Sequence, residues 1–254
     1  MLKLDGVSNF RDLGGLPAAD GRRLRPRVLL RSERLCDLTT GDWAQLAGLP
    51  LTTICDLRSV AERDRHPNSV PAAMSARALD FDIRNDLRAD PGLIAMLRQS
   101  PDAAGAAEVM TEIYRRLPRN LASALGQICA SLSEGGAPML IHCAAGKDRT
   151  GFAVAVLLRL LGVPTEAVEA DYLASRGWPG AHRHRAPLAR RLALSIDSAS
   201  MDGVIDAVLD VRNGYLGAAF STIDREYGSF ERYCEQAVGL SGERRARLRD
   251  TLLE

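Results

Sequence analysis

A cysteine and an arginine, with five residues between them, form the part of the sequence best suited to chemistry. They are Cys143 and Arg149, in the stretch IHCAAGKDRTG that runs from residue 141 to residue 151. A cysteine thiolate is a strong nucleophile, and the planar arginine fork can hold two phosphoryl oxygens at once. The pair therefore predicts attack by the sulfur on a phosphate ester, with the guanidinium stabilising charge in the transition state.

The segments on either side of this stretch are suited to binding an anion. Residues 139–142 form an apolar strand candidate, and residues 150–161 form an apolar helix candidate. The loop amides and the helix start offer unpaired N–H groups and the positive end of a helix dipole. The residues expected to surround the phosphate are Ala144, Ala145, Gly146, Lys147, Asp148 and Arg149. The same position, beside two cations, favours the thiolate form of a cysteine.

Three further residues of the stretch fit supporting roles. Gly146 allows a backbone conformation that a side chain would hinder. The hydroxyl of Thr150 is expected to hydrogen-bond the sulfur and help it leave in a second step. His142 is expected to orient the loop, because a thiolate needs no base. A buried structural cysteine is the commoner fate of a lone cysteine, but the spacing of Cys143 with these residues makes that the weaker interpretation.

The pattern H-C-x-x-G-x-x-R-[ST] resembles the signature loop of protein tyrosine and dual-specificity phosphatases. The longer form HCAAGKDRTG is similar to that of bacterial tyrosine phosphatases related to mycobacterial protein tyrosine phosphatase B. The block SNFRDLGG at residues 8–15 resembles the N-terminal signature of that family. Weaker matches lie at residues 31–32, 56–59, 171–173 and 227–229, so the resemblance covers nearly the whole chain.

This resemblance implies a metal-independent, two-step hydrolysis with no cofactor. The cysteine takes the phosphoryl group as a phosphocysteine, which water then hydrolyses. Relatives act on phosphotyrosine, sometimes on phosphoserine or phosphothreonine, and on phosphoinositides, so a phosphorylated protein or a phosphoinositide is the expected partner. Lys147 resembles loop cations of phosphoinositide phosphatases that meet a second phosphate, although it suits a role in favouring the thiolate equally well.

The leaving oxygen needs a proton, and three aspartates are candidates for the general acid. Many tyrosine phosphatases use an aspartate in a Trp-Pro-Asp sequence before the cysteine. Here residues 178–180 read WPG, lie after the cysteine and are expected to form a turn. The resemblance points instead to Asp148, for which a salt bridge that holds the loop is an equally good role. Asp80 and Asp82, at the end of a predicted strand, are the less favoured candidates.

Four residues outside the loop are candidates for contacts with substrate: Arg11, Asp12, Arg58 and Asp82. Arg11 and Asp12 precede a Gly-Gly turn, and a structural ion pair is their more expected role. Arg58 follows a predicted buried strand on the ligand side of the sheet, and it suits either a substrate contact or a pair with Asp12. The basic run at residues 181–191 forms either a positive rim or a solvated face, and we favour the solvated face.

Short apolar runs alternate with helical patterns along the chain. We expect strands at Val28–Leu30, Thr52–Leu57, Ala76–Leu79 and Met139–His142, and helices at 39–47, around 121–132 and at 150–161. This order predicts an α/β, cysteine phosphatase-like fold, with a central mainly parallel sheet flanked by helices. We expect one phosphatase domain over residues 1–254, with a helical insertion at 86–117 and a helical C-terminal region at 187–254.

Composition narrows the class of protein further. A net charge of +1 argues against binding nucleic acid through bulk charge. The five cysteines are scattered without a C-x-x-C pair, which favours reduced thiols. No apolar run is long enough for stable insertion in a membrane, and the N-terminus lacks a signal-peptide pattern, so we expect a cytoplasmic protein. The sequence indicates no oligomeric state.

Two other function classes share part of this pattern. An arsenate reductase or a sulfur transferase also uses a thiolate at an anion site. A reductase would need resolving cysteines near the nucleophile, and a sulfur transferase is not expected to carry the NFRDLGG block. A non-catalytic phosphate-binding module is the second alternative, although loss of the cysteine or the arginine would be its usual sign.

Overall fold

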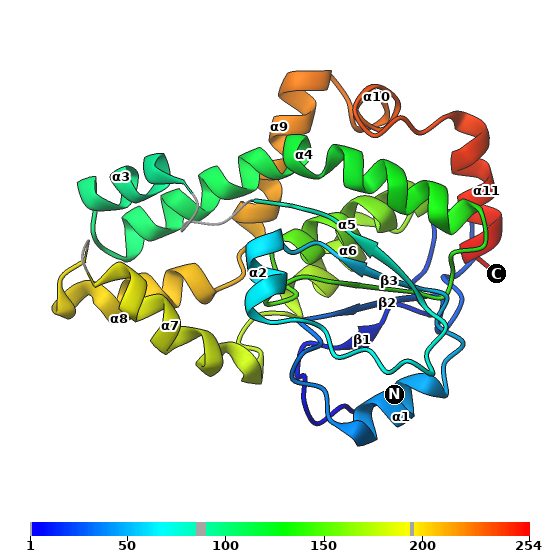
Figure 1. Ribbon diagram of the computed structural model, residues 1–254. Helices are drawn as coiled ribbons and strands as arrows, with labels where there is room; N and C mark the ends of the chain where they lie inside the picture. The colour runs from blue at the N-terminus through cyan, green and yellow to red at the C-terminus, as the bar shows by residue number, and fades with distance from the viewer. Residues whose placement is uncertain (1, 85–89, 194–195) are drawn as a thin grey trace.

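The computed structural model describes residues 2–84, 90–193 and 196–254. Its centre is a five-stranded sheet with the strand order β1-β2-β5-β3-β4 (Figure 1). The strands are β1 (Arg11–Asp12), β2 (Leu29–Ser32), β3 (Thr53–Asp56), β4 (Arg77–Asp80) and β5 (Met139–His142). The last four pair in parallel, and β1 pairs with β2 antiparallel. The predicted α/β fold with a mainly parallel sheet is therefore confirmed.

The register of the three central strands aligns their carboxyl ends. Ser32 of β2 and Asp56 of β3 both lie opposite His142, the last residue of β5. Every residue of these three strands is buried, as expected for parallel strands that are covered on both faces. Cys143 follows His142 directly, so it emerges at the edge where parallel sheets bind their ligands.

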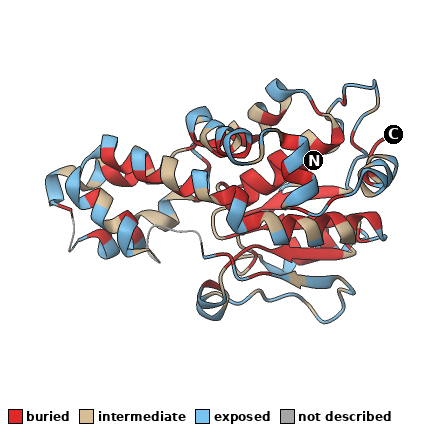
Figure 2. Ribbon diagram, turned by 90° about the horizontal axis from the view of Figure 1, so that it is seen from above, coloured by how far each residue is buried: buried red, intermediate tan, exposed pale blue. Residues whose placement is uncertain are grey.

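Helices cover both faces of the sheet and form two cores. On one face, α1 (Thr40–Ala47) places Trp43 and Leu46 in a cluster with Ile54 and Leu140. On the other face, α4 (Ala103–Ser133) and α5 (Arg149–Leu161) form the larger cluster, which includes Ile141. Figure 2 shows the buried residues concentrated in the sheet and the helices beside it. Successive strand residues thus supply opposite cores.

The remaining helices surround this centre. They are α2 (Val60–Arg65), α3 (Pro91–Gln99), α6 (Thr165–Leu173), α7 (His182–Leu192), α8 (Ser198–Leu209), α9 (Asn213–Tyr227), α10 (Phe230–Gln236) and α11 (Gly242–Leu252), with a 3-10 turn at Pro179–Ala181. In Figure 1, α3, the first half of α4, α7 and α8 form a side lobe beyond one end of the sheet. Over the ranges that the structure describes, no helix combines the length and apolar character needed to cross a membrane.

Both segments expected as helical additions are helical, but their boundaries differ from the prediction. Helix α4 runs through Pro118 without a break, so the insertion does not end at residue 117. Proline normally ends a helix, but Leu117 and Leu121 are fully buried here, and the Pro118 carbonyl accepts a hydrogen bond from the Tyr233 hydroxyl at 2.8 Å. The C-terminal region likewise begins inside α7, which contains Pro187. Residues 86–89 of the expected insertion, and residues 194–195, lie outside the described residues.

Candidate active site

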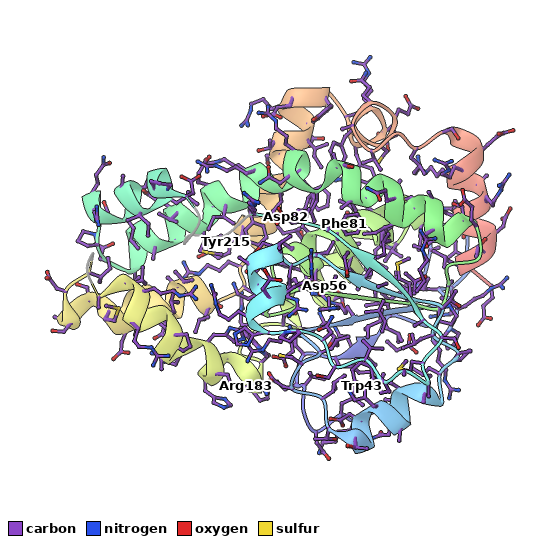
Figure 3. All side chains as sticks on the ribbon, in the orientation of Figure 1. Trp43, Asp56, Phe81, Asp82, Arg183 and Tyr215 are labelled. Carbon is purple, nitrogen blue, oxygen red and sulfur yellow. The ribbon has the colours of Figure 1, made fainter. Side chains whose placement is uncertain are left out.

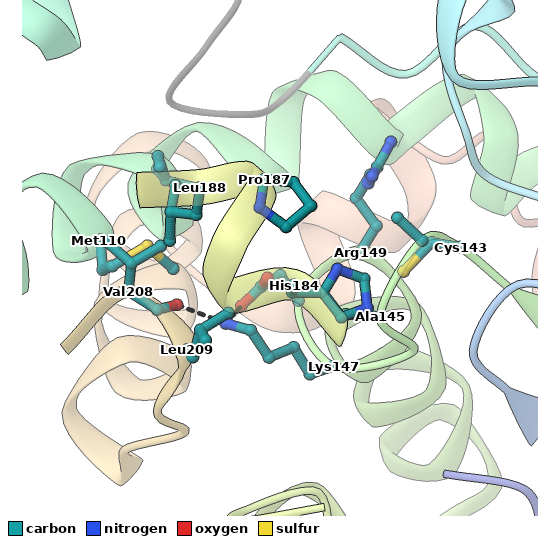
Figure 4. Close-up of a pocket in the computed structure, with 13 residues that line it drawn as sticks. Met110, Cys143, Ala145, Lys147, Arg149, His184, Pro187, Leu188, Val208 and Leu209 are labelled. Atoms are coloured by element: carbon teal, nitrogen blue, oxygen red, sulfur yellow. Dashed lines mark hydrogen bonds and ion pairs between the residues drawn. The ribbon is translucent and has the colours of Figure 1, made fainter. Parts of the chain in front are cut away.

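A pocket brings the signature loop, residues 143–149, together with the side lobe. The loop side consists of Cys143, Ala144, Ala145, Lys147, Asp148 and Arg149. The facing residues are Met110 and Ile113 from α4, His184, Pro187 and Leu188 from α7, and Val208 and Leu209 from the end of α8. Figure 4 shows Cys143 and Arg149 on one side of the pocket and Leu188 and Val208 on the other. The candidate nucleophile and the candidate clamp therefore share one pocket, opposite a largely apolar wall.

The signature loop is held from its outer side. Three consecutive carbonyls accept hydrogen bonds from outside the loop: Ala144 O from Arg34 N (3.2 Å), Ala145 O from Asn9 Nδ2 (2.9 Å) and Gly146 O from Arg31 Nη2 (2.7 Å). In a planar trans peptide, the next N–H points the opposite way from the carbonyl. The N–H groups of Ala145, Gly146 and Lys147 therefore point away from these supports. Successive N–H groups on one side form the cradle that an anion needs.

Gly146 lies where the loop passes close to the end of β2. Its φ is +70°, in the left-handed region that favours glycine. A Cβ atom here would lie 2.5 Å from the Ser32 carbonyl oxygen and 2.7 Å from the Glu33 nitrogen. Both are backbone atoms, so no side-chain rotation relieves the contact. Position 146 therefore needs glycine both because its φ is positive and because there is no room for a Cβ atom.

Arg149 is bound by a carboxylate that the sequence analysis missed. Its Nη1 and Nη2 donate to the two oxygens of Glu62 at 2.6 and 2.8 Å. Nη1 also donates to the carbonyls of Leu57 and Ile83 at 3.2 and 3.1 Å. Glu62 belongs to the capping box of α2, in which its Oε2 accepts from Ser59 N at 2.9 Å. The spacing S-x-x-E at residues 59–62 predicts a helix start, but it does not indicate that the carboxylate reaches Arg149.

Asp148 and Lys147 connect the loop to the helices around it. Oδ1 of Asp148 accepts from the Tyr114 hydroxyl and from the Lys147 ammonium, both at 2.8 Å. Lys147 also donates to the carbonyl of Val208 at the end of α8 at 2.9 Å (Figure 4) and to that of Asp210, just after the helix, at 3.3 Å. A cation at a helix C-terminus is favoured by the helix dipole. Lys147 thus ties the loop to the side lobe, and Tyr114 is a partner that the sequence analysis did not identify.

Behind the loop, His142 and Arg58 belong to a buried polar cluster. Arg58 donates to Asp56 through Nε at 2.9 Å and through Nη2 at 2.6 Å. Asn68 links the two, because its Oδ1 accepts from Arg58 at 2.9 Å and its Nδ2 lies 3.1 Å from His142 Nε2. Burial lowers the pKa of His142 to about 4, although the Asp56 carboxylate acts in the opposite direction. Arg58 therefore pairs with Asp56 and not with Asp12, and it does not line the pocket.

Arg11 and Asp12 also lie apart from the pocket. Arg11 Nε donates to Asp171 Oδ1 at 2.7 Å, so Arg11 forms an ion pair with Asp171 and not with Asp12, and Arg31 pairs with the same carboxylate. Burial acts to raise the pKa of Asp171, but Arg31 and Arg11 together lower it. Asp12 accepts from the Gly14 N–H at 2.9 Å within the Gly-Gly turn. Residues 11, 31 and 171, far apart in sequence, thus meet behind the loop.

The two alternative acids lie near α2 and β4. Asp82 accepts from the backbone N–H of Val60, at the start of α2, at 3.0 Å (Figure 3). Asp80 is the last residue of β4 and lines a different hollow. Neither lines the pocket of Cys143, so Asp148 is the candidate acid that the structure places there.

The hydroxyl of Thr150 does not contact the sulfur in this structure. Its Oγ1 is buried and has no hydrogen-bond partner among the residues described, so the predicted bond to Cys143 is not formed. Cys143 itself is 2% exposed. A buried unpaired hydroxyl costs free energy, which makes Thr150 a group that can gain a partner when a ligand is bound.

The basic run of α7 is divided between ion pairs and the pocket. Arg183 pairs with Glu33 at 3.3 Å, and Arg185 pairs with Asp202 at 3.0 Å. His184 lines the pocket instead. The run is therefore neither an uninterrupted positive rim nor only a solvated face.

Comparisons with known proteins agree with the geometry. Residues 2–254 match the tyrosine phosphatase family. The triple specificity protein phosphatase PtpB of Mycobacterium tuberculosis is 34% identical over 278 residues, which cover 99% of this chain and 98% of that protein. A protein of Cupriavidus necator with a tyrosine-protein phosphatase assignment is 34% identical over 246 residues, 93% of this chain and 84% of that protein. A tyrosine-protein phosphatase of Nostoc commune is 29% identical over 241 residues, 89% of this chain and 74% of that protein.

Proposed function

Because this chain belongs to the tyrosine phosphatase family, it is a phosphatase, and we propose that it works through a phosphocysteine formed on Cys143. Phosphotyrosine in proteins is the main substrate in this proposal, with phosphoserine, phosphothreonine and phosphoinositides as further candidates. The observation that carries it is the set of three outward carbonyls, which turn successive loop N–H groups inward beside Cys143 and Arg149.

In the first step, Sγ of Cys143 attacks the phosphorus of the substrate. The S–P bond forms as the P–O bond to the leaving group breaks, and the leaving oxygen takes a proton from Asp148. Loop N–H groups and the Arg149 guanidinium stabilise the phosphoryl oxygens. Glu62 holds that guanidinium through Nη1 and Nη2 and so fixes its orientation in the pocket that it shares with Cys143.

In the second step, water attacks the phosphorus, and the Asp148 carboxylate takes a proton from it. The S–P bond breaks, inorganic phosphate leaves, and Cys143 returns as the thiolate. The Thr150 hydroxyl, buried and unpaired among the described residues, is the group that we expect to stabilise the leaving sulfur. Neither step of this proposed reaction uses a metal ion or a cofactor.

The wall opposite the loop favours an aromatic phosphate ester. Its apolar residues suit a phenyl ring: Met110, Ile113, Pro187, Leu188, Val208 and Leu209. Lys147 is the residue that the resemblance associates with a second phosphate, but its ammonium is held by Asp148 and the end of α8. A phosphoinositide would have to draw Lys147 away from these partners, which ranks such lipids behind phosphotyrosine.

The nucleophile also sets a requirement on the compartment. A cysteine thiolate reacts only while it is reduced, and all five cysteines of the chain are free. A reducing, cytoplasmic environment is therefore part of the proposal.

The test compares the wild type with Cys143→Ser and with Cys36→Ser, a half-buried cysteine outside the pocket. Phosphate release would be measured with EDTA from a phosphotyrosine peptide, a phosphoserine peptide and soluble phosphoinositides. We expect release by the wild type and by Cys36→Ser, with the phosphotyrosine peptide turned over fastest, and no release by Cys143→Ser. Rapid quenching and intact-protein mass should show one phosphoryl group on the wild type.

Other outcomes would identify the alternatives. A folded wild type that binds vanadate but releases no phosphate from any ester would favour a non-catalytic binding module. Reduction of arsenate with a thiol reductant, without ester hydrolysis, would favour a reductase. Equal release by the wild type and Cys143→Ser would exclude chemistry through Cys143.

A further inference from the structure

A chain of two tyrosine hydroxyls runs from α6 through α4 to the signature loop. Tyr172 donates to the Tyr114 hydroxyl at 2.8 Å, and Tyr114 donates to Oδ1 of Asp148 at 2.8 Å. Both tyrosines are fully buried. Burial raises the pKa of Tyr114 well above its usual value, so this phenol keeps its proton at working pH. A permanent buried donor therefore faces the candidate acid.

The direction of this chain is set by the carboxylate at its end. A phenol has one proton to donate, and an ionised carboxylate has none. Tyr114 must therefore give its proton to Asp148 and accept one from Tyr172. The same direction holds when Asp148 is protonated on its other oxygen, because Oδ1 is still an acceptor. The chain does not have to rearrange as Asp148 loses and regains its proton.

The two carboxylate oxygens of Asp148 have different surroundings. Oδ1 accepts from Lys147 Nζ at 2.8 Å in addition to Tyr114. No donor in the described part of the chain contacts Oδ2, and the side chain is 24% exposed where it lines the pocket. A proton on Oδ1 would face two donors, so Oδ2 is the atom that can carry one.

We propose that Tyr114 is a positioning residue for general acid catalysis: it anchors Oδ1 of Asp148, so that Oδ2 carries the proton for the leaving group. Tyr172 holds the Tyr114 hydroxyl in place. This inference rests on the proposed role of Asp148 as the acid. Proton transfer requires the acid within hydrogen-bond reach of the leaving oxygen. An anchored Oδ1 prevents the carboxyl rotation that would exchange the two oxygens.

A purely structural role for Tyr114 makes a different prediction. Its ring packs against Tyr172 and Tyr215, with centroid distances of 6.1 and 5.6 Å, so it also fills the core. Tyr114→Phe keeps the ring and removes only the hydroxyl. If the hydroxyl served folding alone, its loss would change the rates for all esters equally or not at all.

The experiment measures kcat/KM for aryl phosphates whose leaving groups range from dinitrophenol to phenol, because kcat/KM reports the step in which the leaving group departs and not the later hydrolysis of the phosphocysteine. A good leaving group departs without a proton, whereas phenolate needs one. We expect Tyr114→Phe to lower kcat/KM about 10-fold for phenyl phosphate and less than about 2-fold for the dinitrophenyl ester. Asp148→Asn should show the same pattern with a loss of about 100-fold for phenyl phosphate. Tyr215→Phe is the matched control, because its hydroxyl contacts the Ala207 carbonyl at 3.4 Å.

Two results would overturn the inference in different ways. A uniform loss or no loss in Tyr114→Phe, with a clear leaving-group dependence in Asp148→Asn, would reject the positioning role and leave the proposed function standing. No leaving-group dependence in Asp148→Asn would remove the acid and the inference together. If Tyr114→Phe does not fold, the Tyr172→Phe variant provides the test. We expect it to lower the rate for phenyl phosphate about 2- to 3-fold more than the rate for the dinitrophenyl ester. An equal effect on both esters would reject the positioning role.

Discussion

Asp171 and Tyr172 are neighbours on α6, and they support two different residues of the signature loop. Asp171 pairs with Arg31, whose Nη2 donates to the Gly146 carbonyl at 2.7 Å. Tyr172 begins the hydroxyl chain that ends on Asp148. The end of α6 therefore connects the part of the loop that we expect to bind phosphate with the part that we expect to deliver the proton.

Replacing Asp171 with asparagine should destabilise the fold. The change leaves the guanidinium groups of Arg11 and Arg31 without their carboxylate, and removing one partner of a buried pair costs about 3–5 kcal/mol. Urea unfolding measures this loss in the free energy of unfolding. Asp202→Asn is the matched control, because Asp202 is 90% exposed beside Arg185 and should tolerate the change. Similar stability of the two variants would contradict a structural role for Asp171.

Gly146→Ala should weaken anion binding strongly, with a smaller effect on the free energy of unfolding. The new Cβ would meet backbone atoms of β2 and the residue after it, so the loop has to move, and a shift of about 1 Å in a site costs about 100-fold in rate. Vanadate affinity and phosphate release would measure the loss. Gly21→Ala is the control, since Gly21 has a φ of +87° but no atom within 4 Å of the added Cβ. If both variants bind vanadate like the wild type, the close approach at Gly146 has no functional importance.

Glu62→Gln should impair the reaction through Arg149. Glutamine keeps the size of the side chain but removes the negative charge that holds Nη1 and Nη2 of Arg149. We expect kcat/KM for a phosphotyrosine peptide to fall about 10- to 100-fold, because the clamp loses its alignment. Glu112→Gln provides the control, because Glu112 pairs with Arg116 on the partly exposed face of α4. Unchanged kinetics in Glu62→Gln would show that Arg149 needs no support from this carboxylate.

The sequence was sufficient for the four parallel strands and for the loop, whereas the two-residue strand β1 was not predicted. Apolar runs at residues 139–142 and 150–161 enclose a stretch that must be a turn between a strand and a helix, and the structure has β5, the loop and α5 there. Gly146 was also predictable, because its φ depends on local conformation. Such features follow from periodicity and from the preferences of single residues.

The supports of the loop could not be predicted in the same way. Glu62 and Arg149 are 87 residues apart, and Tyr114 and Asp148 are 34 apart. Their contacts depend on how α2 and α4 pack against the sheet, which no local pattern specifies. The continuity of α4 through Pro118 was not predicted either, because a proline normally ends a helix and the buried residues around this one keep α4 continuous. Arg58 could have been paired correctly, since Asp56 is only two residues away.

The buried neutral state of His142 should make the protein less stable in mild acid. Its pKa in the fold is about 4, against an ordinary value of 6.5 in the unfolded chain. Between these values the unfolded chain binds the extra proton and the native protein does not, so the free energy of unfolding falls as the pH falls through this range. For this residue we expect a loss of about 2 kcal/mol between pH 7 and pH 5.

Urea unfolding of His142→Asn at the same two pH values isolates this contribution. Asparagine does not titrate, so the variant should be less stable than the wild type at pH 7 but should lose less on going to pH 5. His66→Gln is the control, because His66 is more exposed and burial lowers its pKa as well. The His66→Gln variant should therefore still lose most of the free energy of unfolding that the wild type loses between pH 7 and pH 5. A pH dependence in His142→Asn as steep as that of the wild type would mean that His142 is not buried in its neutral form.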